Sequence, residues 1–186
     1  MVSLFSLWLP ILLGAVLVFF VSFIVHMVLK YHHNDFTALP RERDIAGALR
    51  PFAIPPGDYM MPKPADAREM RSPEFLEKLK QGPVMAMTVY PSGPFTMGKQ
   101  LAQWFVYCVI VGIFAAYVAS RTLSPGAEYL QVFRITGTVA FAGYGLALLQ
   151  ASIWMGRRWS TTLKSVFDAL IYALVTAGPF GWLWPS

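Results

Sequence analysis

The first apolar stretch constrains the fold more than any other feature of the sequence. Residues 4–29 contain no Asp, Glu, Lys or Arg. A helix of about 26 residues is about 39 Å long, which exceeds the roughly 30 Å hydrocarbon core of a bilayer. The basic n-region and the small-residue cleavage site of a secretory signal peptide are both missing around it. We therefore expect residues 1–29 to form a retained transmembrane helix.

Three more apolar stretches follow, at residues 100–120, 132–155 and 166–184. Backbone polar groups cannot stay unpaired in hydrocarbon, so each stretch is expected to cross the bilayer as a helix. The last is the least regular, because Asp168 lies at its start and Gly178 with Pro179 should kink or end it. A re-entrant or interfacial fourth segment is therefore the alternative.

The hydrophilic residues are concentrated in one long loop. Hydrophobic residues make up 56% of the chain and charged residues only 13%, and residues 30–98 hold nine Lys and Arg and eight Asp and Glu. This near balance does not form a phosphate-binding patch, so no nucleic-acid partner is expected. The sequence thus divides into a first transmembrane helix at 1–29, a hydrophilic loop at 30–99 and a three-helix transmembrane bundle at 100–186.

Local patterns predict some order within the loop. Residues 41–49 are expected to form a short helix, and a second helix should begin at Ser72, an N-cap residue followed by Pro73. Residues 84–90 read as a strand that pairs with residues 59–61. The predicted fold is an all-α membrane protein with four transmembrane helices and a small mixed α/β cytoplasmic loop domain between the first two.

Basic residues near the helix ends predict the orientation. On the loop side they are Lys30, Lys99, Arg157, Arg158 and Lys164. The opposite side has only Arg121 and Arg134. By the positive-inside rule the loop is cytoplasmic and both termini lie outside. Three of these bases, Arg157, Arg158 and Lys164, could also hold anionic lipid headgroups.

Small residues recur every four positions in three of the expected helices, as close helix packing in lipid requires. They include Gly112 and Ala116, Gly143 and Ala147, and Ala169 and Ala173. The first helix is instead dominated by Leu, Val, Ile and Phe. We therefore expect a compact bundle of the last three helices and a peripheral first helix, against lipid or a partner.

Two groups of residues could bind a metal ion. The histidines His26, His32 and His33 lie close together in the sequence, and imidazole is a common metal or haem ligand. An interfacial polar cluster is the favoured interpretation, because no other apolar stretch contains a histidine. Met60, Met61, Met85, Met87 and Met97 carry thioethers that bind Cu(I), although methionine more often serves as adaptable packing.

Asp168 is the acid placed inside an expected span, where ionisable residues are candidate functional sites. Its position near the start of the helix, one turn after Lys164, favours an interfacial ion pair between the two. Gln150 is a second intramembrane polar candidate. Motifs for nucleophilic catalysis, phosphate binding and zinc hydrolysis are missing, so neither an enzyme nor a cofactor is expected.

Four short segments carry a resemblance. They are IPPGDYM at residues 54–60, YLQVFR at 129–134, WSTTLKS at 159–165 and FGWLWP at 180–185. They resemble an uncharacterised family of bacterial integral membrane proteins of about this length. The resemblance implies a bacterial inner membrane and carries over no activity and no functional residue.

Three functions follow as hypotheses. The leading one is a non-catalytic accessory or scaffold subunit of a bacterial membrane complex, in contact with membrane lipid and with other subunits or further copies of the chain. The second is a small channel or transporter that uses Asp168 and Gln150. The third is haem or copper handling through His26, His32 and His33.

Overall fold

The computed structural model describes residues 1–94 and 96–186. Contacts divide the chain into two compact units. The first unit combines Met1–Phe36 with Thr96–Ser186, and the second consists of residues 37–94 among those described. Each unit is described by itself.

The first unit contains four helical segments that are long and apolar enough to cross a membrane, as the sequence predicted. They are Leu4–Val28, Gly98–Thr122, Tyr129–Met155 and Trp159–Trp182. The first is built from a 3-10 turn Leu4–Leu7, helix α1 at Trp8–Phe23 and a π-helical turn Ile24–Val28, and a short turn Lys30–His32 follows it. The second is α4 at Gly98–Thr122. The third comprises α5 at Tyr129–Gly145, a 3-10 turn Leu146–Leu148 and α6 at Leu149–Met155, and the fourth is α7 at Trp159–Trp182.

The fourth helix is longer than expected at its beginning. It starts at Trp159 rather than Val166, so Asp168 lies more than two turns inside it. Of the two effects expected of Gly178 and Pro179, a kink or an end of the helix, the end does not occur there, because α7 continues to Trp182. Pro179 has no N–H, so one helical hydrogen bond is missing in the last turns of α7. The helix still continues past it, because the carbonyl of Pro179 accepts a hydrogen bond from Leu183 N at 3.0 Å.

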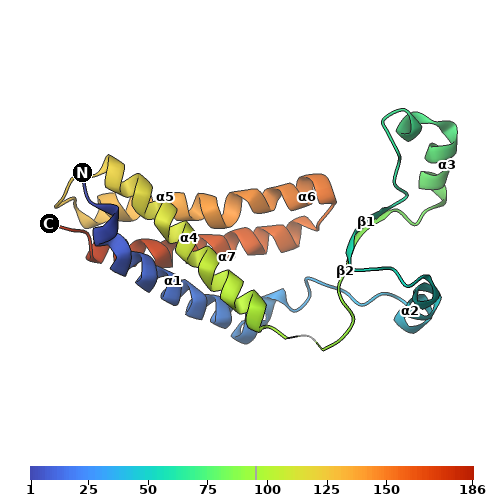
Figure 1. The fold of residues 1–186 in the computed structure, drawn as a ribbon, viewed down its shortest axis with the longest axis horizontal. Coiled ribbons are helices and arrows are strands. Elements are labelled where there is room, and N and C mark those ends of the chain that lie inside the picture. Colours follow the sequence, from blue (N-terminus) through green and yellow to red (C-terminus); the bar gives the residue numbers. More distant parts are fainter. Residues whose placement is uncertain (95) are drawn as a thin grey trace. The chain divides into compact units, whose positions relative to one another are not determined.

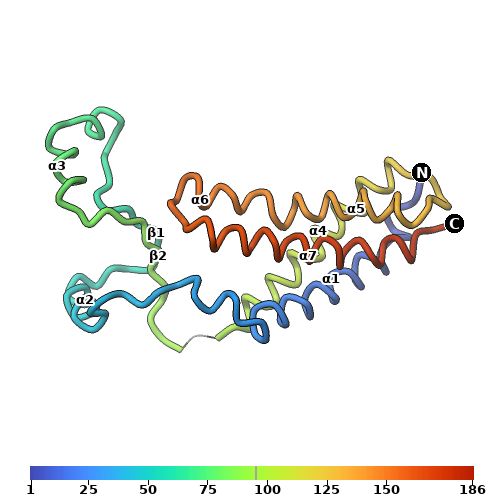
Figure 2. Tube along the Cα trace, turned by 180° about the vertical axis from the view of Figure 1, so that it is seen from behind, coloured from blue at the N-terminus to red at the C-terminus, as the bar shows by residue number. Residues whose placement is uncertain are grey.

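The four segments form an antiparallel bundle in which each helix has two neighbours. Both α1 and α5 pack against α4 and against α7. Figure 1 shows the two chain termini at the end of the bundle that carries the α4–α5 loop, and Figure 2 shows α5 and α7 side by side from behind. Gly126 N donates a hydrogen bond to Pro185 O at 2.8 Å, which ties the C-terminus to this loop.

Helix α1 is a full member of the bundle, so the expectation of a peripheral first helix is wrong. Val18 and Val25 belong to one buried apolar cluster, and Leu7 belongs to another. Trp104 of α4 also donates a hydrogen bond from Nε1 to Ser22 Oγ of α1 at 2.9 Å. Bulky residues on α1 do not keep it apart, because small residues on its neighbours make room for them.

Glycines at the helix contacts show this fit. A Cβ at Gly112 of α4 would lie 3.3 Å from Cγ2 of Ile11 in α1, and a Cβ at Gly14 would lie 3.6 Å from the backbone oxygen of Thr176 in α7. At Gly143 of α5 a Cβ would lie 3.3 Å from the Val111 side chain of α4. Close backbone approach of this kind replaces hydrophobic burial as the source of helix packing in lipid.

The other small residues of the expected stripes are divided between the interior and the surface. Ala116, Ala169 and Ala173 are buried. Ala147 differs from the expectation, because it lies in the 3-10 turn between α5 and α6 and is exposed.

The second unit contains two helices and a two-stranded sheet. Helix α2 spans Glu42–Leu49, strand β1 Gly57–Met61, helix α3 Pro73–Gln81 and strand β2 Met85–Val89, with 3-10 turns at Arg50–Phe52 and Glu69–Arg71. The two strands pair, as the sequence predicted, and the structure shows that they run antiparallel with Tyr59 opposite Met87. Ser72 Oγ accepts a hydrogen bond from Phe75 N at 3.1 Å, which confirms the predicted N-cap of α3.

Candidate functional site

The strongest cluster of polar side chains lies where the chain leaves α1 and passes over α7. After the π-helical turn, Leu29 is extended, and the short turn at Lys30–His32 redirects the chain. Backbone hydrogen bonds from His33 N to Lys30 O and from Asp35 N to His32 O, each 3.0 Å, hold this segment folded. The fold thereby places residues 31–35 against Lys164 and Asp168 of α7.

Asp168 accepts hydrogen bonds on both carboxylate oxygens. Oδ1 accepts from the hydroxyl of Tyr31, and Oδ2 lies 2.8 Å from Nε2 of His32. The residue is 2% exposed. A carboxylate this deeply buried is costly unless hydrogen bonds and charges compensate it, and these two contacts supply the compensation.

His32 bridges Asp168 to a second carboxylate. Its Nδ1 lies 2.6 Å from Oδ2 of Asp35, whose side chain is 8% exposed. Lys164 completes the cluster, because Nζ donates to Oδ1 of Asp35 at 2.8 Å and to the backbone oxygen of Tyr31 at 2.6 Å. We refer to Tyr31, His32, Asp35, Lys164 and Asp168 as the Asp168 network.

The charges of the Asp168 network balance within it. Both ring nitrogens of His32 face carboxylate oxygens. Only an imidazolium donates from both nitrogens, so the charges balance when His32 has this form. Two carboxylates then face one imidazolium and one ammonium group, and the sum of the charges is zero.

The network shifts the protonation of its two members that lie outside the long helices. Burial raises the pKa of the Asp35 carboxyl, but hydrogen bonds and charge from Lys164 and His32 outweigh burial and hold the pKa below its usual value. Burial and the hydrogen bond to Asp168 raise the pKa of the Tyr31 hydroxyl. Tyr31 is therefore a proton donor to Asp168 throughout the physiological pH range.

The sequence-predicted histidines are partly brought together. The rings of His26 and His32 have centroids 4.8 Å apart, and Nε2 of His26 lies 3.3 Å from the hydroxyl of Tyr172. His26, His32 and the exposed His33 line one open pocket beside the network. Both nitrogens of His32 are engaged by carboxylates, and within residues 1–94 and 96–186 no three His, Cys, Asp or Glu side chains are arranged to hold a metal ion.

The remaining predicted residues lie outside the network. Gln150 is exposed on α6 rather than buried. Arg157 and Arg158 directly precede α7, and their role as lipid-headgroup ligands stays a prediction. Lys164 was expected to pair with Asp168, but in the structure it pairs with Asp35.

Sequence reasoning missed Tyr31 and Asp35, because both fall in the segment assigned to the hydrophilic loop. One spacing in the sequence pointed to Asp35, and none pointed to Tyr31. His32 and Asp35 have the three-residue spacing of a helical-turn pair, and Lys164 and Asp168 have the four-residue spacing of another. The first pair forms, but the sequence could not show that His32 also contacts Asp168 and that Lys164 pairs with Asp35 instead of Asp168.

The comparisons with known proteins add no relative. No protein-family model matches the chain, and neither a curated protein nor a solved structure matches it. The chemistry of the site is therefore argued from its geometry alone. That geometry can do two things: fix the segment after α1 to α7, and connect ionisable groups through hydrogen bonds along which a proton can move.

We expect Asp168→Ala to destabilise the protein by about 3–5 kcal/mol, because it removes the acceptor of the Tyr31 hydroxyl and one of the two carboxylates that His32 faces, and leaves a gap in the buried site. The free energy of unfolding in mixed micelles measures this change. Gln150→Ala is the matched control, since an exposed side chain should change it by no more than about 0.5 kcal/mol. Equal effects of the two substitutions would contradict a structural role for the network.

We expect Asp35 to make stability depend on acid pH. Its pKa is depressed in the folded state, so its contribution is fully present above the unfolded-state pKa of about 4 and is lost as the pH falls through the folded-state value. Asp35→Asn should therefore lower stability at neutral pH and flatten its decline below about pH 4. Unfolding midpoints between pH 3 and 7 measure this slope, and Asp44→Asn, at an exposed ion pair, should leave it unchanged. The same slope in Asp35→Asn and the wild type would refute the assignment.

Proposed function

We propose that this chain is a multi-pass protein of the bacterial inner membrane that acts as a non-catalytic accessory or scaffold subunit of a larger membrane complex. In this proposal the four long helices cross the bilayer and hold the chain in place. The unit formed by residues 37–94 lies on the cytoplasmic side and binds another membrane protein.

The outward surface of the bundle is apolar, which supports its proposed location in lipid. Large apolar side chains are exposed on all four long segments, among them Phe20, Phe114, Ile153 and Phe167. Water would make such a surface an aggregation hazard, whereas lipid tails are as apolar as these side chains. The interior combines larger apolar side chains such as Val132 with small and polar residues such as Ala116 and Thr136, a mixture compatible with helices packed in a bilayer.

The distribution of basic residues between the two ends of the bundle supports the proposed orientation in the membrane. The end of α1, the start of α4 and the α6–α7 turn lie at one end, which carries Lys30, Lys99, Arg157, Arg158 and Lys164. The end with both termini carries Arg121 and Arg134. The positive-inside rule then puts the first end, and the unit of residues 37–94 that follows it in the chain, in the cytoplasm.

The observation that carries the accessory role is the missing core of the second unit. Among its described residues Phe75 is the one large hydrophobic side chain that is buried, at 3% exposure. Exposed large hydrophobic residues occur on both of its helices and both of its strands, including Ile45, Leu49, Met60, Leu76 and Met85. A unit of this size needs a core for independent stability, and exposed apolar surface of this kind is typical of interaction sites.

A protein fits this unit better than a lipid headgroup surface. The nine bases and eight acids of residues 30–98 nearly cancel, so anionic lipids would exert little net attraction. A partner subunit can cover the apolar side chains and leave the mixed charges at the rim, which is the usual composition of a protein interface. The Asp168 network contributes by fixing the chain to α7 just before this unit begins at residue 37.

A second candidate function is proton-coupled transport through Asp168. It is favoured by one observation: His32, which lines an open pocket with His26 and His33, lies within hydrogen-bond distance of a carboxylate buried in α7. Intramembrane carboxylates of this kind often carry protons in transporters. Gln150 adds no support, because it is exposed.

We expect the double substitution Ile45→Asp with Leu49→Asp to abolish association with the partner subunit. The two side chains lie one turn apart on α2 and are both exposed, so the added charges would be buried at an interface without compensation. Purification from native membranes in mild detergent measures the stoichiometry of the co-purifying protein. Gly47→Asp is the matched control, because its site on the opposite side of the same helix is open and gains the same kind of charge.

Loss of the partner only in the double variant would support the proposal. A wild-type chain that purifies alone and monodisperse, or equal loss in Gly47→Asp, would contradict it.

We expect Asp168→Asn to distinguish the second function from the first. An amide keeps the size of the side chain but cannot release a proton, so proton flux would stop if Asp168 carries it. Flux into liposomes that contain the purified protein, driven by a pH gradient and read with an internal pH dye, measures this. Wild-type flux above that of empty liposomes, lost in Asp168→Asn and kept in Gln150→Ala, would establish transport. Wild-type flux no higher than that of empty liposomes would exclude it.

A further inference from the structure

Arg134 is a charge without a partner inside one of the long helices. It lies five residues after the start of α5, so its Cα is about 7.5 Å along the helix. Within residues 1–94 and 96–186 its guanidinium group makes neither a hydrogen bond nor an ion pair of the kinds formed elsewhere in the bundle. Arg121, at the same end, donates to Met1 Sδ at 3.5 Å and stacks over the Tyr117 ring at 5.6 Å.

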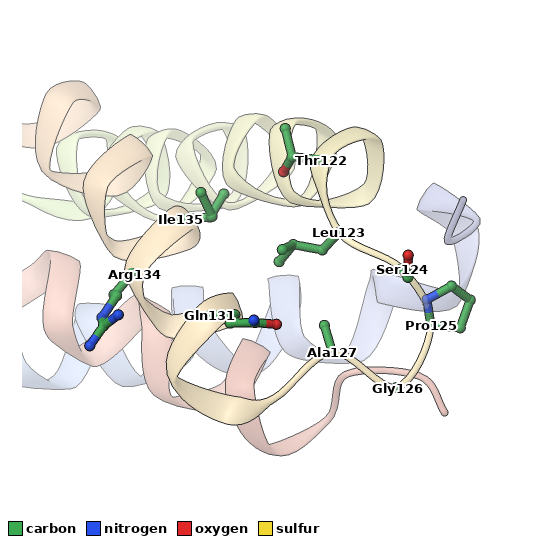
Figure 3. Close-up of a pocket in the computed structure, with 9 residues that line it drawn as sticks. All are labelled: Thr122, Leu123, Ser124, Pro125, Gly126, Ala127, Gln131, Arg134 and Ile135. Carbon is green, nitrogen blue, oxygen red and sulfur yellow. The ribbon is translucent and has the colours of Figure 1, made fainter.

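Two cavities of different character meet at Arg134. The first has a volume of about 540 Å³ and is formed by the α4–α5 loop together with Gln131, Arg134 and Ile135 (Figure 3). The second has a volume of about 270 Å³ and lies between α5 and α7, where apolar side chains such as Phe133, Phe141 and Leu174 line it. Arg134 lines both.

The shape of the second cavity fits a hydrocarbon chain. It follows α5 from Phe133 to Phe141, which is about 12 Å along the helix axis, and leads from the end of the bundle towards its middle. Gly137 and Ala173 line it without large side chains and keep it open. The first cavity supplies polar groups near the surface, including the Ser124 hydroxyl and the Gln131 amide.

We infer that Arg134 and these two cavities form a binding site for one anionic phospholipid, with the phosphate on Arg134, the headgroup in the loop cavity and an acyl chain in the groove between α5 and α7. The Arg134 side chain is exposed near the start of α5, and a planar guanidinium group binds phosphate with two parallel hydrogen bonds. The inference rests on the membrane location given in the proposed function. It adds a specific lipid site at the end of the bundle opposite the Asp168 network.

A free phosphate ion shares the headgroup chemistry, but it would leave the apolar groove empty. The test therefore compares three probes on the purified, delipidated full-length chain: phosphatidylglycerol, phosphatidylcholine and inorganic phosphate. Native mass spectrometry measures how much of each probe stays bound as its concentration rises. We expect phosphatidylglycerol to bind with one-to-one stoichiometry and more tightly than phosphatidylcholine, and inorganic phosphate not to displace it.

Substitutions at Arg134 and Thr138 test the phosphate contact and the acyl-chain contact of the lipid separately. Arg134→Gln should weaken phosphatidylglycerol binding by about tenfold or more, because a charge-assisted hydrogen bond contributes about 1.5–3 kcal/mol. Arg134→Lys should recover part of this loss. Thr138→Trp, at an exposed position on the groove, should weaken both lipids by filling the space for the acyl chain. Arg121→Gln is the matched control and should change binding by less than about twofold.

Each remaining outcome counts against the inference. Equal loss in Arg134→Gln and Arg121→Gln would show attraction to positive charge in general, and displacement of the lipid by inorganic phosphate would show an anion site without lipid specificity. Alkaline carbonate extraction separates this inference from the proposed function. A chain that leaves the membrane fraction refutes the membrane location, whereas a chain that stays there and binds lipid independently of Arg134 refutes only the lipid site.

Discussion

Burial of the Asp168 carboxylate is the constraint on which one end of the bundle depends. An ionised carboxylate inside a helix must find donors and opposite charge, because water is not there to supply them. Tyr31 and His32 meet this requirement from the segment after α1, and Lys164 and Asp35 complete the charge balance. A single buried acid thus fixes where a whole stretch of chain runs.

A second constraint, the pairing of backbone polar groups, explains how much of the fold the sequence predicts. Four apolar stretches predict four helices because no other backbone conformation pairs its own polar groups along one segment. The second unit was also predictable in part, since the Ser72 cap depends on short-range chemistry and both strands have residue types that favour extended backbone. Features decided by neighbours in the sequence were therefore predicted well.

Features decided by contacts between distant segments were not predicted from the sequence. The start of α7 at Trp159 was hidden because its first turns are polar, and the partner of Lys164 comes from a segment 129 residues away. The exposed positions of Ala147 and Gln150 follow from the 3-10 turn at Leu146–Leu148. Three residues at about 120° each, in place of about 100°, turn the following helix by about 60° away from the face that a continuous helix would present.

The two ends of the bundle differ in how they satisfy charge, and this difference bears on function. At the Asp168 network the charges of both carboxylates are matched within the chain, so this end gains rigidity and has little left to offer a ligand. At the other end Arg134 lines two cavities. The second unit, taken by itself, exposes apolar side chains that a core would bury. Among the described residues the interior leaves the Tyr144 hydroxyl buried without a hydrogen-bond partner, whereas the Arg134 side chain and the apolar side chains of the second unit lie on the surface. Exposed apolar surface of this kind is typical of interaction sites.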